Sequence, residues 1–376
     1  MIETNTMVGT GIKVVCQREE LTHRLGVVAR AVSARASVQI LSGVLLRAEA
    51  GRLHLAATDM ELSLRSSLDA QVEGEGSVVV PGRLLVELVR LLPESEVTFE
   101  HRAEENVLHV TSGPSSSTLH TYAAEDFPRL PDLDTVGTFT VDRESLLDTV
   151  SRVSRSASRD ESRPVLTGIL VRFEAGKLVM AATDSYRLSV KETELPGDIP
   201  ELEAIIPARA LAELGRIAQT GDTIELGVHE NQVVFTADDV WLTTRRIDGQ
   251  FPNYKQLLPE TFEHDVKLPR GELLDVVRRV GVMVQRTSPI QLRFAEGELT
   301  VFARTQDVGE AKESLPVQFS GEPLEIGFNS EFLREGIETI AAEEIQLRLI
   351  SPLRPAVIEG GEDDPTYLIM PIRLPG

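Results

Sequence analysis

Arginines spaced seven residues apart recur along this sequence. Four of these pairs are Arg83 with Arg90, Arg152 with Arg159, Arg209 with Arg216, and Arg279 with Arg286. Seven residues are nearly two turns of an α-helix, so the two side chains of a pair leave the same helical face. Guanidinium groups arranged in this way can neutralise nucleic-acid phosphates without reading the base sequence. Exposed helices also carry arginine for other reasons, but recurrence at matching places favours a shared basic surface.

Two carboxylates suggest a different chemistry. Asp59 and Asp184 each end the sequence Ala-Ala-Thr-Asp and could serve as general acids or bases. They stand 125 residues apart in separate copies of one motif, and aspartate after a strand is a common turn residue. We therefore interpret both as structural and predict that the chain is not an enzyme.

The sequence contains no signature of a cofactor site. It has no Gly-x-x-x-x-Gly-Lys-Ser/Thr phosphate loop, so we expect no ATP hydrolysis by the chain itself. Cys16 is the only cysteine, and the seven histidines show no metal-ligand spacing. We predict that the protein needs neither a cofactor nor a metal.

Repeated motifs identify the units that carry these residues. Leu53–Asp59 recurs as Leu178–Asp184 at an offset of 125, and Val80–Leu88 recurs as Ile206–Leu214 at an offset of 126. A weaker third copy opens at Arg270. Units of about 120 residues can each bury a core of their own. We predict a flexible tail over 1–12 and three domains over 13–135, 136–260 and 261–376.

Each copy has the pattern helix, strands, helix, strands. In the first copy a helix over 18–33 is indicated by one apolar stripe, formed by Leu21, Leu25, Val28 and Val32. A glycine turn at 49–52 joins two apolar-rich strands, and it recurs in the other copies. Second helices are expected over 82–92, 208–219 and 331–342, the last capped by Asn329 and Ser330. The expected fold class is α+β, with two helices of each copy packed on antiparallel sheet.

The composition limits the classes of protein to consider. The net charge of −21 argues against an overall basic surface for nucleic acid, but not against a local cluster of arginines. No apolar run is long enough to span a membrane, and the start lacks a basic-then-apolar signal peptide. A single cysteine suits a reducing compartment. We expect a cytoplasmic protein with no membrane partner.

These motifs resemble one family, the bacterial sliding clamp, which is the beta subunit of DNA polymerase III. The resemblance rests on the triplication, on Ala-Thr-Asp at the end of the hairpin, on the Phe-Pro motif at 251–259, and on Tyr367–Leu374. It covers essentially residues 13–374. It implies a head-to-tail homodimer whose six domains form a ring, acting as a processivity factor that encircles double-stranded DNA. The implied partners are the replicative polymerase alpha subunit, the clamp loader, and other polymerases and repair proteins.

The resemblance assigns residues to three surfaces. It adds Arg35 to the paired arginines that face DNA. It implies an apolar pocket between copies two and three for short partner peptides, lined by Leu166, Gly168, Thr183, Ser185, Tyr186, Arg187, Leu188, Pro252, Leu257, Asn329, Phe332, Leu353, Met370, Pro371, Ile372, Arg373 and Leu374. It also implies a dimer contact between Leu119 and Val282. Relatives place arginines beside Leu119, whereas this chain has Pro114-Ser-Ser-Ser117, so we expect the ionic part of that contact to be missing.

Two other classes of protein remain compatible with the sequence. One is an acidic hydrolase with triplicated domains that uses Asp184 near Arg187 at a domain junction. The other is a plain scaffold dimer with no DNA in its hole. Hydrolase assays address the first, and retention on circular but not linear DNA addresses the second.

Overall fold

The computed structural model describes most of the chain in two compact units. The described residues are 11–33, 38–130, 137–197, 199–229, 231–285, 288–306 and 308–374. Unit 1 comprises Met1–Val141 with Arg216–Arg245, and unit 2 comprises Asp142–Gly215 with Arg246–Gly376. The predicted tail is described only from residue 11, and Arg35 and Arg286 lie outside the described residues.

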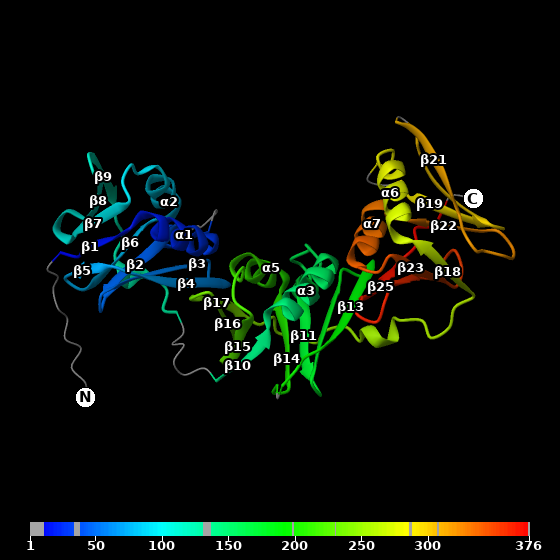
Figure 1. Ribbon diagram of the computed structural model, residues 1–376, viewed down its shortest axis with the longest axis horizontal. Helices are drawn as coiled ribbons and strands as arrows, with labels where there is room; N and C mark the ends of the chain where they lie inside the picture. Colours follow the sequence, from blue (N-terminus) through cyan, green and yellow to red (C-terminus); the bar gives the residue numbers. More distant parts are fainter. Residues whose placement is uncertain are drawn as a thin grey trace. The chain divides into compact units, whose positions relative to one another are not determined.

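Unit 1 contains two antiparallel sheets (Figure 1). The smaller sheet has the order β5-β1-β7-β8-β9, formed by Gln71–Glu73, Lys13–Gln17, Glu96–Arg102, Val107–Ser112 and Ser115–His120. The larger sheet has the order β10-β15-β16-β17-β4-β3-β2-β6, formed by Thr138–Asp142, Thr223–His229, Gln232–Ala237, Val240–Arg245, Leu62–Asp69, Arg52–Thr58, Gly43–Glu49 and Gly76–Pro81. Because β17 pairs with β4, the larger sheet runs from the second sequence copy into the first.

Two helices, α1 over Arg18–Val28 and α2 over Gly82–Leu91, pack together in unit 1 (Figure 1). The predicted stripe of α1 is confirmed, since Leu21, Leu25 and Val28 are fully buried. The helix ends earlier than predicted because Ala29–Ala31 tightens into the 3-10 turn η1 and the next residue has an extended backbone. Three more 3-10 turns lie in this unit: η2 at Gln39–Ser42, η3 at Ala103–Glu105 and η4 at Ala124–Asp126.

The predicted glycine hairpins form in both units. Ala50 and Gly51 between β2 and β3 have φ values of 49° and 75°. Ala175 and Gly176 occupy the equivalent turn with φ values of 50° and 76°. Two successive residues with positive φ are the mark of a type I′ turn, whose twist matches that of the paired strands.

Unit 2 also contains two sheets. The larger has the order β14-β11-β12-β13-β25-β24-β23-β18, formed by Leu202–Pro207, Gly168–Glu174, Lys177–Thr183, Arg187–Glu194, Thr366–Ile369, Ala356–Glu359, Glu344–Leu349 and His264–Pro269. The smaller has the order β21-β20-β19-β22, formed by Gly309–Pro316, Glu298–Thr305, Ile290–Ala295 and Leu324–Phe328. Here the pairing of β13 with β25 joins the second copy to the third.

The helices of unit 2 cover an apolar core. They are α3 over Arg143–Val153, the short α4 over Pro164–Thr167, α6 over Arg270–Gly281 and α7 over Ser330–Thr339, with 3-10 turns η5 at Ser154–Ser156 and η6 at Tyr254–Gln256. Helix α5, Ala208–Ile217, crosses the boundary between the units. The core includes Leu273, Val277 and Val280 of α6 together with Leu333 and Ile337 of α7. Asn329 caps α7 as predicted, because its side-chain oxygen accepts the backbone N–H groups of Glu331 and Phe332 over 3.0 Å each.

The same strand pairing is used at both boundaries between copies. Strand β4 pairs with β17, and their repeat equivalents β13 and β25 pair in the same antiparallel manner. The strands of the second copy are thereby divided, with β10 and β15 to β17 in unit 1 and β11 to β14 in unit 2. Strand β9 is the equivalent of β17 in the first copy, and β21 is the equivalent of β4 in the third copy. Each is an end strand of its sheet.

Candidate functional site

Four of the predicted arginines lie exposed on two helices at equivalent places in the repeat. Arg83 and Arg90 are on α2, and Arg209 and Arg216 are on α5. Helix α2 buries its other side, which includes Leu85. An amphipathic helix of this kind must turn its charged residues outward. These four residues therefore have the placement that contact with phosphate groups requires.

Arg152 differs because its side chain is largely buried against two carboxylates. Its Nε donates to Asp148 Oδ1 over 2.7 Å, and its Nη1 donates to Asp364 Oδ1 over 2.8 Å. The same Nη1 donates to the carbonyl oxygen of Thr339 over 2.9 Å. Only 19% of the side chain is exposed. The prediction of an exposed arginine is wrong here, since two carboxylates hold Arg152 against the end of α7.

The predicted pairing of Arg152 with Arg159 on one helical face is also wrong. Helix α3 ends at Val153, and Ser154–Ser156 forms the 3-10 turn η5. The backbone of Ala157 is extended, with φ −67° and ψ 144°. Arg159 is exposed, but it lies in a loop beyond the helix.

Arg279 lies exposed on α6 and is paired with a neighbouring strand. Its Nη2 is 2.7 Å from Glu313 Oε2 on β21. The hydrogen bond from Arg279 lowers the pKa of Glu313. Helix α6 ends at Gly281, so it includes only Arg279 of the predicted pair Arg279 and Arg286.

Large apolar side chains of the predicted peptide pocket are exposed on unit 2. The exposed fractions are 62% for Tyr186, 49% for Leu257, 63% for Leu353 and 39% for Met370. The backbone N–H of Met370 donates to the carbonyl oxygen of Tyr186 over 2.8 Å, which places these two residues side by side. Contiguous exposed apolar groups mark interaction surfaces. The turn between β12 and β13 and the C-terminal segment therefore present neighbouring exposed apolar side chains.

The C-terminal segment after β25 is held against β22. The backbone N–H of Ile372 donates to the carbonyl oxygen of Gly327 over 2.7 Å. A Cβ on Gly327 would lie 2.6 Å from Cδ2 of Leu374, so only glycine leaves room for that leucine. Arg373 is exposed, and the residues on either side of it are half-buried.

Arg187, next to the exposed Tyr186, is held in place by several contacts. Its Nε donates to Asp184 Oδ2 over 3.0 Å, and its Nη1 bonds Glu335. Its guanidinium carbon lies 4.1 Å from the centre of the Phe332 ring. The Tyr367 hydroxyl donates to the carbonyl oxygen of Phe332 over 2.8 Å, and burial raises the pKa of this tyrosine. Together these contacts fix the side of the predicted pocket formed by α7.

The other predicted pocket residues all belong to unit 2 and differ in burial. Four are buried: Leu166, Gly168, Thr183 and Leu188. Six are half-buried: Pro252, Asn329, Phe332, Pro371, Ile372 and Leu374. Ser185 is exposed.

Asp59 and Asp184 serve the same turn in the two copies. Asp184 Oδ1 accepts the backbone N–H groups of Tyr186 and Arg187 over 2.9 and 3.0 Å. Asp59 Oδ1 accepts the N–H groups two and three residues further on, over 3.1 and 2.9 Å. Carboxylates engaged in this way stabilise the turn, as predicted for aspartate after a strand.

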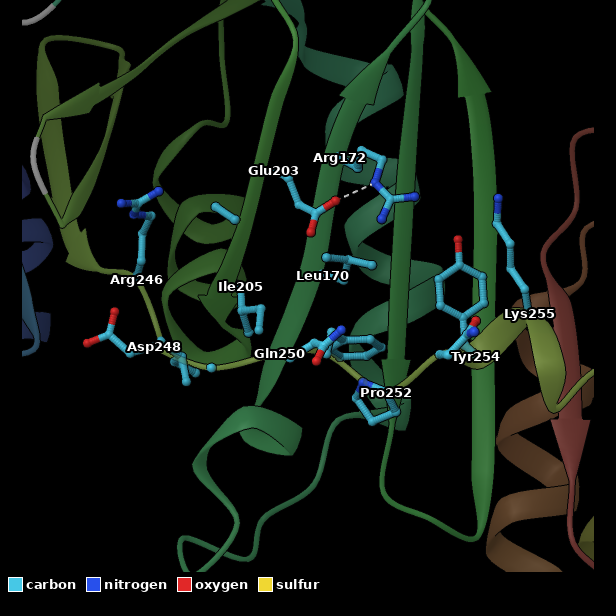
Figure 2. Close-up of a pocket in the computed structure, with 15 residues that line it drawn as sticks. Leu170, Arg172, Glu203, Ile205, Arg246, Asp248, Gln250, Pro252, Tyr254 and Lys255 are labelled. Atoms are coloured by element: carbon cyan, nitrogen blue, oxygen red, sulfur yellow. Dashed lines mark hydrogen bonds and ion pairs between the residues drawn. The ribbon is translucent and has the colours of Figure 1, made fainter.

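Sequence reasoning missed two pockets on the outer faces of the large sheets. The pocket of unit 2 has a volume of about 540 Å³ and lies between β11, β14 and the segment 246–255. Figure 2 shows Arg172 paired with Glu203 over 2.6 Å on one side and Tyr254 on the other. A pocket of about 590 Å³ lies at the equivalent place in unit 1. The repeated Phe-Pro at 127–128 and 251–252 lines both and was the available signal.

The two predicted dimer residues differ in exposure. Val282 is 75% exposed at the end of α6, whereas Leu119 on β9 is only 6% exposed. The neighbouring β9 residues Thr118 and His120 are exposed, so alternation along the strand turns Leu119 inward. Little of Leu119 is left for contact with a second copy.

The described residues bear on two further classes of site. None of their helices is both long and apolar enough to cross a membrane. Among the same residues, no cluster of three or more His, Cys, Asp or Glu side chains could hold a metal ion.

The fold and these surfaces define an α+β protein built from three tandem clamp domains. Family models match it in order: the N-terminal domain of the DNA polymerase III beta subunit over 12–131, the central domain over 140–253 and the C-terminal domain over 255–373. A beta sliding clamp from Synechococcus elongatus is 36% identical, covering 96% of this chain and all of the relative. One from Streptomyces coelicolor is 33% identical and covers 97% of this chain and all of the relative.

A solved structure agrees with these relatives. It is a sliding clamp from Pseudomonas aeruginosa bound to griselimycin, with a TM-score of 0.89 and 28% identity, covering 97% of this chain and all of that chain. The chain belongs to the DNA polymerase III beta subunit family, the bacterial sliding clamps. Its role is accordingly that of a non-catalytic processivity subunit of a DNA polymerase.

Proposed function

We propose that two copies of this chain close head to tail into a ring that encircles duplex DNA. The observation that carries the proposal is the repeated strand pairing at the boundaries between copies. Strands β4 and β17 pair, and their equivalents β13 and β25 pair. Strand β21 is the repeat equivalent of β4, strand β9 is the repeat equivalent of β17, and each is an end strand of its sheet. Pairing β21 of one chain with β9 of another would repeat the arrangement of the two junctions and leave neither of these edges unpaired.

The repeat also gives the register of the proposed contact. Leu242 lies opposite Leu64 in one junction, and their equivalents Tyr367 and Ser189 lie opposite each other in the next. The corresponding residues on β9 and β21 are Ser117 and Ala311, because Ala311 pairs with Ala303 as Ser189 pairs with the equivalent Ala182. We therefore expect Ser117 of one chain to face Ala311 of the other.

The side chains at these edges favour backbone and apolar contacts over ion pairs. The segment 114–117 carries no charge, and Glu313 on β21 is already paired with Arg279. Val308, which is 49% exposed beside β21, adds to the exposed Val282. Apolar contacts weaken little with salt, unlike exposed ion pairs.

A cysteine cross-link tests both the ring and its register. Cys16 is buried, so Ser117→Cys with Ala311→Cys would be the reactive pair. Mild oxidation should convert the double variant to a covalent dimer that is lost on reduction. The matched control is Ser116→Cys with Ala311→Cys, because Ser116 points to the opposite sheet face. A stable monomer at micromolar concentration, or equal cross-linking of both variants, would contradict the proposal.

The exposed arginines supply the DNA contact in this proposal. If the two helices of each repeat line the hole with axes about 10 Å apart, the opening is about 28 Å across, enough for a hydrated duplex. Arg83, Arg90, Arg209 and Arg216 would then offer weak, sequence-independent phosphate contacts, which allow sliding. Arg159 and Arg279 are secondary candidates, and the paired Arg152 is the weakest.

The exposed apolar surface of unit 2 would bind partner peptides. Peptides anchor through a few apolar side chains placed in such surfaces. A relative of known structure binds griselimycin, which supports a ligand site on this fold. We propose that the replicative polymerase alpha subunit, the clamp loader and other polymerases and repair proteins compete for it. Arg373→Ala, or removal of residues 370–376, should abolish peptide binding and leave the dimer intact.

Retention on DNA of different topology tests the function as a whole. With a clamp loader and ATP, the protein should remain on nicked circular DNA and leave linear DNA by its ends. Arg83→Ala with Arg90→Ala should shorten the lifetime on circles and weaken its dependence on salt. Equal retention on linear and circular molecules would rule out encirclement.

A further inference from the structure

The outer face of the large sheet in unit 1 carries a row of side chains that is only partly kept in unit 2. Leu45 on β2 lies opposite Ala56 on β3, Ala56 lies opposite Arg65 on β4, and Arg65 lies opposite Trp241 on β17. Residues directly opposite one another in a sheet share one face. Trp241 is the only tryptophan of the chain, and it is half-buried.

The equivalent row in unit 2 shows that the sheet does not need these two residues. It runs from Leu170 through Ala181 and Val190 to Thr366, with the same strand pairing. Leucine and alanine are kept, whereas arginine and tryptophan are replaced by valine and threonine. Arg65 and Trp241 therefore are not requirements of this strand arrangement.

The row forms the floor of the pocket of about 590 Å³ in unit 1. Phe127, Pro128 and Leu130, from the segment after η4, cover one side of it. The pocket size lies in the range of small-ligand and peptide-anchor sites, which are mostly apolar with a few polar groups. A flat sheet face would offer no such enclosure.

Basic side chains surround this apolar floor. Arg47, Arg65 and Arg129 line the pocket, and Glu49 is the one carboxylate among its lining residues. Partial burial and then Arg52 lower the pKa of the nearby His54, which fits a positive local potential. The surrounding chain carries a net charge of −21, so this pocket opposes the general sign of the surface.

The pocket of unit 2 is less positive, because its lining has Arg172, Arg246 and Lys255 but also two carboxylates, Glu203 and Asp248. There Arg172, the equivalent of Arg47, is paired across the strands with Glu203, as Figure 2 shows. Arg47 instead lies opposite Ser77, and its own partner is Glu49 on the same strand. The two equivalent pockets therefore differ by one carboxylate, and the pocket of unit 1, with three arginines and one carboxylate, is better suited to an acidic ligand.

We propose that the pocket formed by Trp241, Arg65, Arg47, Arg129 and Phe127 binds a short acidic peptide segment of a partner protein through an aromatic or aliphatic anchor. The apolar floor would take the anchor side chain, and the arginines would bind flanking carboxylates. This docking site is separate from the apolar surface around Tyr186 and Met370. It does not depend on the proposed DNA contact.

Trp241 allows a direct test, because it is the only tryptophan. The full chain is titrated with the blocked peptide Ac-Asp-Glu-Phe-Leu-Glu-Asp-NH2 while tryptophan fluorescence and binding heat are recorded. A saturable fluorescence change is expected. The peptide Ac-Asn-Ser-Phe-Leu-Ser-Asn-NH2 should bind at least tenfold more weakly, and the difference should shrink with added salt.

Variants taken from the repeat itself separate binding from folding. Arg65→Val and Trp241→Thr introduce the residues of the equivalent row in unit 2, and each should weaken binding at least tenfold by calorimetry. Arg129→Ala changes an exposed residue, so it should leave the fold intact and still weaken peptide binding. It replaces either of the other variants if that variant is less stable than the wild type. Arg172→Ala in the other pocket is the matched control and should leave binding unchanged.

Two results would overturn the proposal. One is equal affinity of the wild type, Arg65→Val and Arg129→Ala for the acidic peptide. The other is a decathymidylate oligonucleotide that changes Trp241 fluorescence at lower concentration than the peptide, which would make the pocket a nucleic-acid site.

Discussion

The two junctions between sequence copies share a backbone plan but differ in how their charges are buried. The first junction is the β4 and β17 pairing with the turn Asp238–Asp239, and the second is the β13 and β25 pairing with Asp363–Asp364, 125 residues later. In the first, Arg24 of α1 donates to the carbonyl oxygen of Asp238 over 2.8 Å and lies 3.7 Å from the Asp239 carboxylate. In the second, Arg152 of α3 bonds Asp364 directly over 2.8 Å.

The acceptor carboxylates have different surroundings. The side chain of Asp239 is 72% exposed, and that of Asp364 is 4% exposed. Asp364 also accepts the backbone N–H groups of Ala341, Ala342 and Gly361. One strand pairing can thus be accompanied by a loose or a tightly satisfied polar cluster. The tight cluster belongs to the same unit as the candidate peptide pocket, where a fixed surface lowers the cost of ordering on binding.

The largest expected effect comes from breaking the buried pair. Arg152→Ala leaves Asp364 buried without its charged partner, so we expect unit 2 to lose about 3 to 5 kcal/mol of stability. Urea unfolding followed by circular dichroism measures the loss, and hydrogen exchange in β13 and β25 locates it.

Arg83→Ala is the matched control for this variant, since it removes an exposed helix arginine of the same predicted class. Its stability should change by less than about 0.5 kcal/mol, while retention on circular DNA falls. If Arg152→Ala left stability unchanged and reduced DNA retention, Arg152 would be a DNA contact and not a structural residue.

Acid should weaken the second junction. Burial alone would raise the pKa of Asp364, but three backbone N–H groups and Arg152 together lower it below the usual 3.8. Its stabilising contribution is therefore complete above the unfolded pKa and is lost as the pH falls through the folded value. The protection factors of amides in β25 against hydrogen exchange should fall below about pH 4.

Asp364→Asn tests the origin of this acid sensitivity. The variant should be less stable at neutral pH and should lose part of the pH dependence. An unchanged pH profile in the variant would assign the acid sensitivity to other carboxylates.

Local signals in the sequence predicted much of this fold. Glycine turns such as Ala50–Gly51, apolar stripes such as that of α1 and the Asn329 cap depend on residues close together in the chain, and they formed where expected. Helix ends were less accurate, because the 3-10 turn after Val153 ends α3 before Arg159 and no breaker residue marks it.

Side-chain partners distant in sequence could not be predicted. Arg152 has the same spacing as Arg83, but its partner Asp364 is 212 residues away. The row from Leu45 to Trp241 exists only because β4 pairs with β17 across two copies. Exposure of an arginine depends on which carboxylates the fold brings near it. Aligning the repeats identifies equivalent positions, but it does not show which charged side chains lie near each position in the fold.

The smallest expected effect is at the first junction. Arg24→Ala removes a hydrogen bond to the Asp238 carbonyl and a 3.7 Å pair with an exposed carboxylate, so we expect a loss of about 1 kcal/mol. Double-mutant cycles of Arg24 with Asp239 and of Arg152 with Asp364 compare the junctions directly. The first coupling should be below about 0.5 kcal/mol and should vanish in high salt, because Asp239 is solvated. The second should be several times larger and persist in salt. Equal couplings would mean that burial of the acceptor does not set the strength of these junctions, and that the shared strand pairing alone holds the copies together.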